Sequence, residues 1–230
     1  MSLKNMKILN FDTSLEKTYI SLSIDKEVVF SKIIENQTGI YHSAFLIPTI
    51  VELLQKNNLQ IKDLDYIATN LGPGSFTGIR ACLVVARTLC QQYDIKALGV
   101  SSLEILSQIN NTDKKSLIML DARKEMAYVE IIDNNGIILQ SPCARLVKDI
   151  VEDIKNGDYF VIADNKMSQM LNENNIAHVD YSLKAYDLGK FLNEFTQKFV
   201  ENNKGYDYNW AKLKPLYIQP PPVSTPKAKV

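Results

Sequence analysis

The sequence predicts an α/β protein built from two lobes of the same design. The first observation is the order of the predicted elements, because each half of the chain reads strand, strand, strand, helix, strand, helix, strand, helix. The second is that the first strand of each half ends alike, in Phe11-Asp12-Thr13 and in Leu120-Asp121-Ala122. A duplicated order of elements indicates a duplicated unit. Each lobe is therefore expected to hold a mostly parallel sheet that carries an antiparallel hairpin.

In the first half, a short apolar run over residues 7–11 ends at Asp12 and predicts a buried strand. Apolar and polar residues alternate over 18–24, and the turn signal Asp25-Lys26 leads into a second extended run over 27–34, which predicts a hairpin. Helical period then predicts a helix over 41–55, with apolar positions Phe45, Ile47, Ile50, Val51 and Leu54. A strand over 65–70, a loop over 71–75, a helix over 76–93 and a strand over 96–100 follow. The half ends with a helix over 101–109 that is capped by Ser101 or Ser102.

The second half repeats this order. A strand over 116–120 ends at Asp121, and extended runs over 126–132 and 137–140 flank Asn135-Gly136, a strong hairpin signal. The next elements are a helix over 145–155, a strand over 159–163, a helix over 165–174 and a strand over 176–179. The last is a helix over 183–202, whose apolar stripe consists of Leu188, Phe191, Leu192, Phe195, Phe199 and Val200. We divide the chain into an N-terminal lobe (1–106), a C-terminal lobe (107–218) and a flexible, proline-rich tail (219–230).

The balance of charges argues against some classes of function. The chain has 230 residues, with 26 Lys and Arg against 26 Asp and Glu, so its formal net charge is zero. That balance argues against a basic surface for nucleic acid or for anionic membranes. It also provides little repulsion between molecules, which suggests that the chain works with a partner.

The sequence also predicts where the protein acts. No apolar run approaches the ~20 residues of a membrane span, and the first residues show no secretory signal. The cysteines Cys82, Cys90 and Cys143 form no disulfide framework, which favours a reducing compartment. We therefore expect a cytoplasmic protein.

The run Gly72-Pro73-Gly74-Ser75-Phe76-Thr77-Gly78-Ile79-Arg80 follows a strand and opens a helix. Glycines allow a sharp turn, and free amides at the start of a helix attract anions. The Lys and Ser/Thr of a Walker loop are missing, so this is not a P-loop NTPase. The pattern leaves two interpretations open, a tight strand-to-helix turn and an anion or nucleotide site. The candidate contacts of such a site are Asp12, Gly72, Gly74, Ser75, Thr77 and Gly78.

The helix that follows this loop is apolar around its whole circumference over residues 81–86. A surface helix normally keeps one polar face. We therefore expect this helix to be covered on both sides, either inside its own chain or by a second molecule.

The order of the elements is similar to the ribonuclease-H-like lobe that is doubled in the actin, sugar-kinase and heat-shock ATPase (ASKHA) superfamily. The run over 72–80 resembles the signature of the TsaB (YeaZ) family. Further matches follow in the same order: residues 8–14, His42-Ser43, residues 100–104 and Asp121-Ala122-Arg123. The resemblance covers roughly residues 6–130.

The resemblance implies a non-catalytic subunit. TsaB proteins resemble the catalytic subunit TsaD without carrying its active site. They work with TsaD and the ATPase TsaE to transfer a threonylcarbamoyl group to the tRNA adenosine beside the anticodon. On this basis the chain needs no cofactor of its own, ATP acts through TsaE and TsaD, and tRNA is contacted only indirectly.

The resemblance also implies an interface. The first two long helices, here 41–55 and 75–93, pack against their counterparts in TsaD or, without TsaD, in a second copy. The candidate interface residues are His42, Phe45, Thr49, Phe76, Arg80, Leu83, Val84, Val85 and Arg87.

Two enzymatic alternatives lack sequence features that they require. A glycoprotease-like metallopeptidase needs metal ligands, but the helical i, i+4 histidine pair of TsaD-like proteins is here His42 and Leu46. A stand-alone ATPase of the superfamily needs a glycine-rich turn after Asp12, and residues 13–17 contain no glycine. No catalytic residue and no metal ligand is therefore assigned. We interpret Asp121 and Arg123 as an inter-lobe salt bridge or a partner contact.

Overall fold

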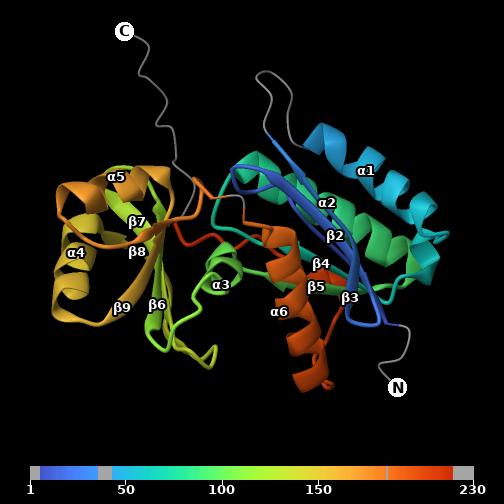
Figure 1. Cartoon of the computed structure of the whole chain (residues 1–230). Helices are drawn as coiled ribbons and strands as arrows, with labels where there is room; N and C mark the ends of the chain where they lie inside the picture. Colours follow the sequence, from blue (N-terminus) through green and yellow to red (C-terminus); the bar gives the residue numbers. More distant parts are fainter. Residues whose placement is uncertain (1–5, 36–42, 185, 220–230) are drawn as a thin grey trace, which may run out of the picture.

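The computed structural model describes residues 6–35, 43–184 and 186–219, which form two five-stranded sheets (Figure 1). The strand order is β3-β2-β1-β4-β5 in the first sheet and, read from its far edge, β8-β7-β6-β9-β10 in the second. In each sheet the first three strands along the chain are antiparallel and the others join in parallel. The two lobes therefore share one topology, as the duplicated sequence pattern predicts.

The elements of the first half lie close to their predicted positions. They are β1 (Lys7–Asp12), β2 (Thr18–Ile24), β3 (Glu27–Ile34), α1 (Ser43–Lys56), the short helix η1 (Ile61–Asp63), β4 (Tyr66–Asn70), α2 (Phe76–Tyr93), β5 (Lys96–Val100) and α3 (Ser102–Ser107). Ser101 caps α3, and Glu104 completes a capping box by accepting a hydrogen bond from the Ser101 amide.

The second half departs more from the prediction. It contains β6 (Lys115–Asp121), β7 (Met126–Ile132), β8 (Ile138–Leu146), α4 (Val147–Asn156), β9 (Tyr159–Ala163), α5 (Asn165–Glu173), β10 (Val179–Asp180), α6 (Leu188–Asn202) and the short helix η2 (Trp210–Lys212). Strand β8 runs on past its predicted end because it pairs with β7 as far as Leu146, opposite Met126. Helix α6 begins at Leu188, where Asp187 caps it, and not at 183.

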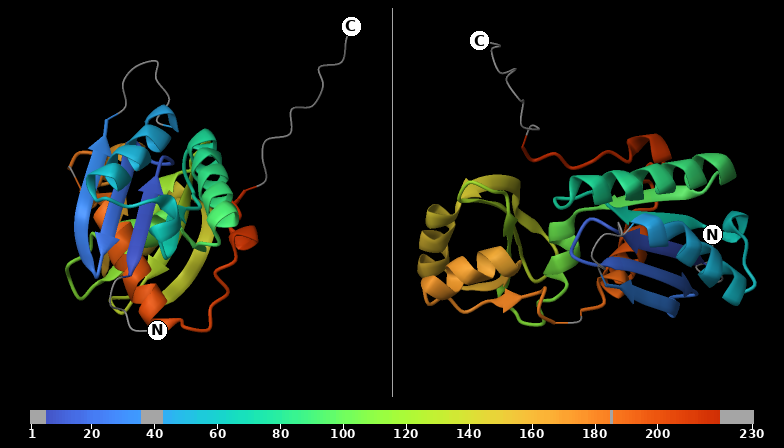
Figure 2. Two further views of the ribbon diagram at one scale, coloured as in Figure 1. Left: turned by 90° about the vertical axis from the view of Figure 1, so that its right-hand side faces the viewer. Right: turned by 90° about the horizontal axis from the view of Figure 1, so that it is seen from above.

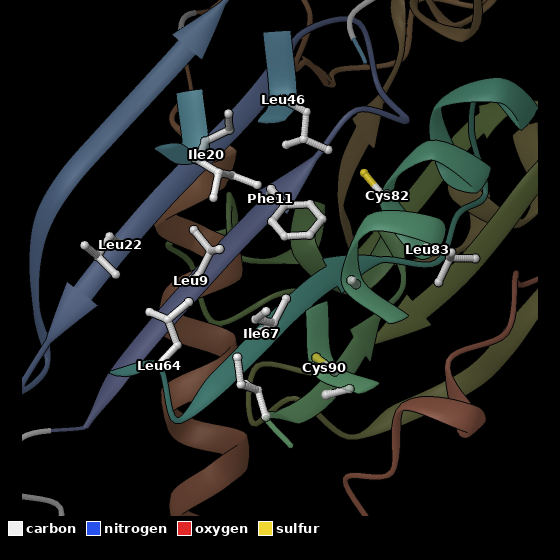
Figure 3. Packing of buried hydrophobic residues seen from close by; sticks show 14 of the residues in the cluster. Leu9, Phe11, Ile20, Leu22, Leu46, Leu64, Ile67, Cys82, Leu83 and Cys90 are labelled. Carbon is white, nitrogen blue, oxygen red and sulfur yellow. The ribbon is translucent and has the colours of Figure 1, made fainter. Parts of the chain in front are cut away.

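The first sheet is covered on both faces. Helices α1 and α2 bury one face around a core in which Phe11 and Ile20 of the sheet meet Leu46 of α1 and Cys82 of α2 (Figure 3). Helix α6 covers the opposite face, as Figure 1 shows. This covering positions α1 and α2 on the outside of the molecule.

Helix α6 corrects the predicted division of the chain, which placed residues 107–218 in one lobe. The helix packs on β1, β2 and β3 of the first sheet. Polar side chains on those strands bond to it: the Ser21 hydroxyl donates to the Gly189 carbonyl at 2.7 Å, and the Asn10 amide donates to Asn193 Oδ1 at 3.0 Å. Buried polar groups need such partners, so the sheet residues select this helix. The predicted tail lies outside the described residues except for Gln219.

The two lobes meet around α3, which lies between the sheets (Figure 1). One apolar cluster joins both lobes there. It includes Ala68, Leu98 and Val100 of the first sheet, Leu103 and Leu106 of α3, Ile118, Leu120 and Ile132 of the second sheet, and Leu188 and Leu192 of α6. None of the helices in the described part of the chain combines the length and apolar character that a bilayer crossing requires.

Glu130 on β7 has an ionisable side chain that is buried in this inter-lobe region. It is 0% exposed, and neither carboxylate oxygen has a hydrogen-bond partner among the described residues. Alternation along β7 places it on the same side as Tyr128 and Ile132, which belong to the inter-lobe cluster. Burial, and secondarily the charge of Glu104, raises the pKa of Glu130 from 4.5 to about 8.

Because of Glu130, we expect the free energy of unfolding to decrease as the pH rises. A pKa raised on folding gives stability that is complete below the unfolded value of 4.5 and is lost as the pH rises through the folded value of about 8. Glu130→Gln removes this proton linkage. Melting curves at about pH 5 and about pH 9 should show the variant gaining about 5 °C on the wild type at the higher pH. A constant difference at both pH values, like that expected for the surface control Glu27→Gln, would contradict this.

Candidate functional site

The loop between β4 and α2 lies where several strand ends of the first lobe meet. The Gly72 amide donates to Asn70 Oδ1 at 2.7 Å, and the Gly72 carbonyl accepts from the Ser102 amide at 2.9 Å. The Ser75 amide donates to the Ser14 carbonyl at 2.7 Å. The loop therefore ties together the ends of β1 and β4 and the start of α3.

Two glycines of this loop are required by close backbone contact. A Cβ on Gly78 would lie 2.0 Å from the Thr13 carbonyl oxygen, and one on Gly74 would lie 2.5 Å from the Ser14 carbonyl oxygen. Both distances are too short for any side chain. The close approach accounts for both glycines without a bound anion, which is the tight-turn interpretation of the motif.

Side chains reinforce this contact. The Thr13 hydroxyl donates to the Gly78 carbonyl at 2.8 Å, and the Thr13 amide donates to Cys82 Sγ at 3.1 Å. Burial raises the pKa of the Cys82 thiol to about 12, so it stays protonated at neutral pH. Ser75 caps α2 as predicted, because its hydroxyl accepts from the Gly78 amide at 3.3 Å.

Asp12 organises the end of β1. Its carboxylate is 1% exposed and accepts hydrogen bonds from the Ser14 amide (2.7 Å), the Ser14 hydroxyl (2.6 Å) and the Asn70 side-chain amide (2.8 Å). Burial raises the pKa of Asp12, and these hydrogen bonds act against that rise. The hydrogen bonds come from two residues, Ser14 just after β1 and Asn70 at the end of β4, so the carboxylate ties these two strand ends together. Of the candidate anion contacts, the structure brings Asp12, Gly72, Gly74, Ser75 and Gly78 together and leaves Thr77 exposed on α2.

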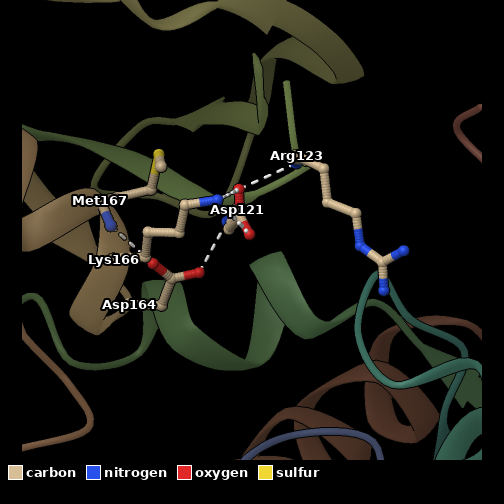
Figure 4. Close-up of polar contacts among 5 residues, drawn as sticks. All are labelled: Asp121, Arg123, Asp164, Lys166 and Met167. Atoms are coloured by element: carbon tan, nitrogen blue, oxygen red, sulfur yellow. Dashed lines mark hydrogen bonds and ion pairs between the residues drawn. The ribbon is translucent and has the colours of Figure 1, made fainter. Parts of the chain in front are cut away.

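The equivalent corner of the second lobe contains Asp121, Asp164 and Lys166 (Figure 4). Lys166 Nζ lies 2.9 Å from Asp121 Oδ1, and the Asp121 amide donates to Asp164 Oδ2 at 2.6 Å. The first interpretation of Asp121 and Arg123, an inter-lobe salt bridge, is therefore wrong, because the ion pair of Asp121 lies within the second lobe. The second, a partner contact, stays a prediction. The Arg123 side chain points away from this cluster, and only its backbone amide bonds to Asp121, at 2.8 Å.

Helix α2 has a core side and an exposed side. Its buried residues are Gly78, Ile79, Cys82, Leu83, Ala86 and Cys90. Phe76 (46% exposed) and Val84 (64% exposed) lie on the surface with Arg80 and Arg87. The helix is therefore covered by its own chain on one side and open on the other, so of the two predicted covers the chain supplies one side only, and a cover by a second molecule stays a prediction.

Burial also corrects part of the predicted interface. Leu83 and Thr49 are each 4% exposed, and Leu83 belongs to the core, so neither side chain is available to a partner. Phe45 and Val85 are half-buried. His42 lies outside the described residues.

Helix α1 contributes exposed apolar side chains that the predicted pattern placed in the core. Ile47 is 57% exposed and Val51 is 44% exposed, whereas the predicted positions Ile50 and Leu54 are buried together with Leu46 and Leu53. The helical pattern does not distinguish the buried side from the exposed side, because apolar residues lie on both sides of this helix. Helices α1 and α2 contact each other on the same side of the first sheet, so we treat their exposed residues together. We call this set the outer α1–α2 face: Ile47, Val51, Phe76, Arg80, Val84 and Arg87.

The C-terminal segment lies along α2 beside this face (Figure 2). The Arg80 guanidinium carbon lies 3.9 Å from the centroid of the Phe76 ring, which in turn stacks on Tyr217 at 5.8 Å. The Arg87 guanidinium carbon lies 5.7 Å from the Trp210 ring. Sequence reasoning missed this arrangement, and its one signal was the single tryptophan in an otherwise polar stretch.

We expect Gly78→Ala to destabilise the fold by about 3 kcal/mol or more, because the new methyl group meets backbone that cannot move away. Gly205→Ala is the matched control, since a Cβ there meets nothing within 4 Å. Urea or thermal unfolding of both variants measures the difference. Equal stability of the two variants would show that the contact does not constrain the loop.

Comparison with known proteins identifies the family. The model of the family TsaD, tRNA N6-adenosine threonylcarbamoyltransferase, matches residues 28–155, and curated relatives are named tRNA threonylcarbamoyladenosine biosynthesis protein TsaB. The chain belongs to the TsaB (YeaZ) branch of this family. The relative from Buchnera aphidicola subsp. Schizaphis graminum is 32% identical, and the alignment covers 57% of the chain but only 63% of the relative. The relative from Haemophilus influenzae is 29% identical over 94% of the chain and 95% of its own length.

Solved structures agree on the fold. The structure of YeaZ from Pseudomonas aeruginosa superposes with a TM-score of 0.72 at 20% identity, covering 92% of the chain and 99% of that protein. Together with the repeated strand order, this confirms an α/β fold of two lobes that share one topology.

Proposed function

We propose that the chain is a non-catalytic subunit in tRNA threonylcarbamoyladenosine biosynthesis and that it binds a TsaD-type catalytic subunit through the outer α1–α2 face. The names of its relatives support the process. The observation that carries the interface is the grouping of Ile47, Val51 and Val84, all exposed, on two neighbouring helices. Single exposed apolar residues are ordinary, but a group on one surface marks a contact site.

The composition of the face fits a protein interface. Aromatic residues and arginine are enriched at such interfaces, and Phe76, Arg80 and Arg87 are exposed on the same helix as Val84. Burial of apolar surface contributes about 25 cal/mol per Å², so the exposed side chains can supply part of the binding free energy. A partner that contacts this face more favourably in its active conformation would be shifted toward that conformation.

The non-catalytic part of the proposal rests on how the polar residues near the loop are used. Asp12 is committed to Ser14 and Asn70, and Cys82 is a buried, protonated thiol. Within the described ranges, no group of three or more His, Cys, Asp or Glu side chains is placed to hold a metal ion. In this proposal ATP acts through TsaE and TsaD, and tRNA is bound by the partner.

We expect Val84→Glu to weaken binding to TsaD at least about 100-fold, because an unpaired carboxylate would be buried in the interface. The substituted side chain is 64% exposed in the free chain, so the fold should be unaffected. The matched control is Ile137→Glu, at a position 59% exposed in the second lobe. Titration calorimetry gives the affinities, and a Val84→Glu complex of wild-type affinity would remove this face from the interface.

Reconstitution tests the function itself. TsaD, TsaE, tRNA and the threonylcarbamoyl-adenylate are combined with and without the chain, and modified adenosine is measured. We expect modification to depend on the chain. Turnover of ATP or of a peptide by the purified chain alone would instead favour the stand-alone ATPase or metallopeptidase.

A further inference from the structure

Glu130 places a carboxyl group on the boundary between the two lobes. The side chain is 0% exposed, and neither carboxyl oxygen has a hydrogen-bond partner among the described residues. A buried carboxyl group without a partner destabilises its surroundings, and it does so most strongly when it is ionised. The packing at this boundary therefore depends on whether Glu130 carries a proton.

Helix α3, which lies between the sheets in Figure 1, is attached to the two lobes in different ways. On the side of the first lobe, the Ser102 amide donates to the Gly72 carbonyl at 2.9 Å, and the Ser102 hydroxyl donates to the Pro73 carbonyl at 2.6 Å. In the part of the chain that the structure describes, no hydrogen bond joins residues 102–107 to β6 or β7, and apolar side chains make the contact. We call the contact between residues 102–107 and β7 the α3–β7 boundary. The helix can therefore move away from β7 without breaking a hydrogen bond between them.

Helix α3 also brings a second carboxyl group to this boundary. Glu104 is the one ionisable residue of the helix, and its Oε2 accepts a hydrogen bond from the Ser101 amide at 3.0 Å. After burial, the charge of Glu104 is the second cause of the raised pKa of Glu130. Two carboxyl groups therefore lie at the α3–β7 boundary, one on each side of it.

No positive charge from the main elements packed on β7 compensates Glu130. These elements are α3, β6 and β8, and α3 contains no Lys or Arg. Ile118 of β6 lies opposite Glu130, and successive side chains of a strand alternate between the two faces of a sheet. The charged and titratable side chains of the two neighbouring strands lie on the other face: Lys115 and Asp121 of β6, and Cys143 and Arg145 of β8. Tyr128 is the other titratable residue on the Glu130 face of β7.

Ionisation of Glu130 favours opening at the α3–β7 boundary. When the carboxyl group gives its proton to solvent, its negative charge lies near that of Glu104 in apolar surroundings. Water reaches the carboxylate if α3 moves away, while the pairing of β7 with β6 and β8 stays intact. The connection to β6 is exposed over residues 111–114, so it can follow this movement. Local opening of this kind costs less than unfolding of either sheet.

We propose that Glu130 is a pH-dependent switch between the lobes: its neutral carboxyl group keeps the second sheet packed on α3, and loss of the proton opens the α3–β7 boundary. The inference goes beyond the proposed function, since it involves neither TsaD nor the outer α1–α2 face.

The direction of the pH dependence follows from the two states. In the closed state burial raises the pKa of Glu130 from 4.5 to about 8, and in the open state water restores the ordinary value. The closed state is therefore favoured most below pH 4.5, loses stability as the pH rises toward about 8, and changes no further above it. Between these values the open fraction increases at most about tenfold per pH unit.

Amide hydrogen exchange of the full chain, followed by mass spectrometry, measures this opening. The protection of the α3 peptide (residues 101–110) is measured from about pH 5 to about pH 9, after correction for the intrinsic exchange rate. We expect it to fall about tenfold or more between about pH 6 and about pH 8 in the wild type. Glu130→Gln keeps the side chain neutral, so its α3 protection should not change with pH. Glu27→Gln, at an exposed position of β3, is the matched control and should behave as the wild type.

Urea separates opening at the boundary from unfolding of the whole chain. Local opening exposes little surface, so about 1 M urea should leave exchange in α3 nearly unchanged while it accelerates exchange in β2 of the first sheet.

Glu104→Gln tests the contribution of the second carboxyl group. Gln can replace Glu in the capping box, so α3 keeps its cap while the neighbouring charge is removed. The pKa of Glu130 should then fall, and the loss of α3 protection should level off at a lower pH than in the wild type. The inference is overturned if Glu130→Gln keeps the wild-type pH dependence of α3 exchange, or if urea accelerates exchange in α3 as strongly as in β2.

Discussion

The architecture depends on one backbone contact, between the turn that follows β1 and the first turn of α2. The Thr13 and Ser14 carbonyls lie so close to Gly78 and Gly74 that no side chain could stand between them. The contact is then locked by the Thr13 hydroxyl and by the carboxylate of Asp12. Because α2 is fixed at its start, the rest of this long helix has a single orientation on the sheet. That orientation determines which of its residues face the core and which face outward.

The outer surface follows from this constraint. With Ile79, Cys82 and Ala86 directed inward, the helical period places Phe76, Arg80 and Arg87 together on one flank of α2 and Val84 further from the core. The C-terminal segment then adds Trp210 and Tyr217 as supports for the arginines.

The sequence was sufficient for the elements and the topology where patterns are local. The hairpins, the range of α2 and its Ser75 cap follow from alternation, helical period and capping chemistry. It was insufficient where apolar residues stand on both sides of a helix, as with Ile47 and Leu46, because periodicity alone does not distinguish a core face from a binding face. The ion pair of Asp121 could not be predicted from the sequence either, since it depends on which of several nearby charges lies in the same lobe.

The crossing of α6 has a consequence for synthesis on the ribosome. The first sheet is complete in sequence by Val100, yet the polar row on its inner face, including Asn10, Ser21 and Ser23, finds its partners only in residues 189–196. The emerging N-terminal lobe therefore keeps one face uncovered until residues 189–196 have been made. The second lobe, whose strands all lie between Lys115 and Asp180, has no such dependence and can complete its own sheet first.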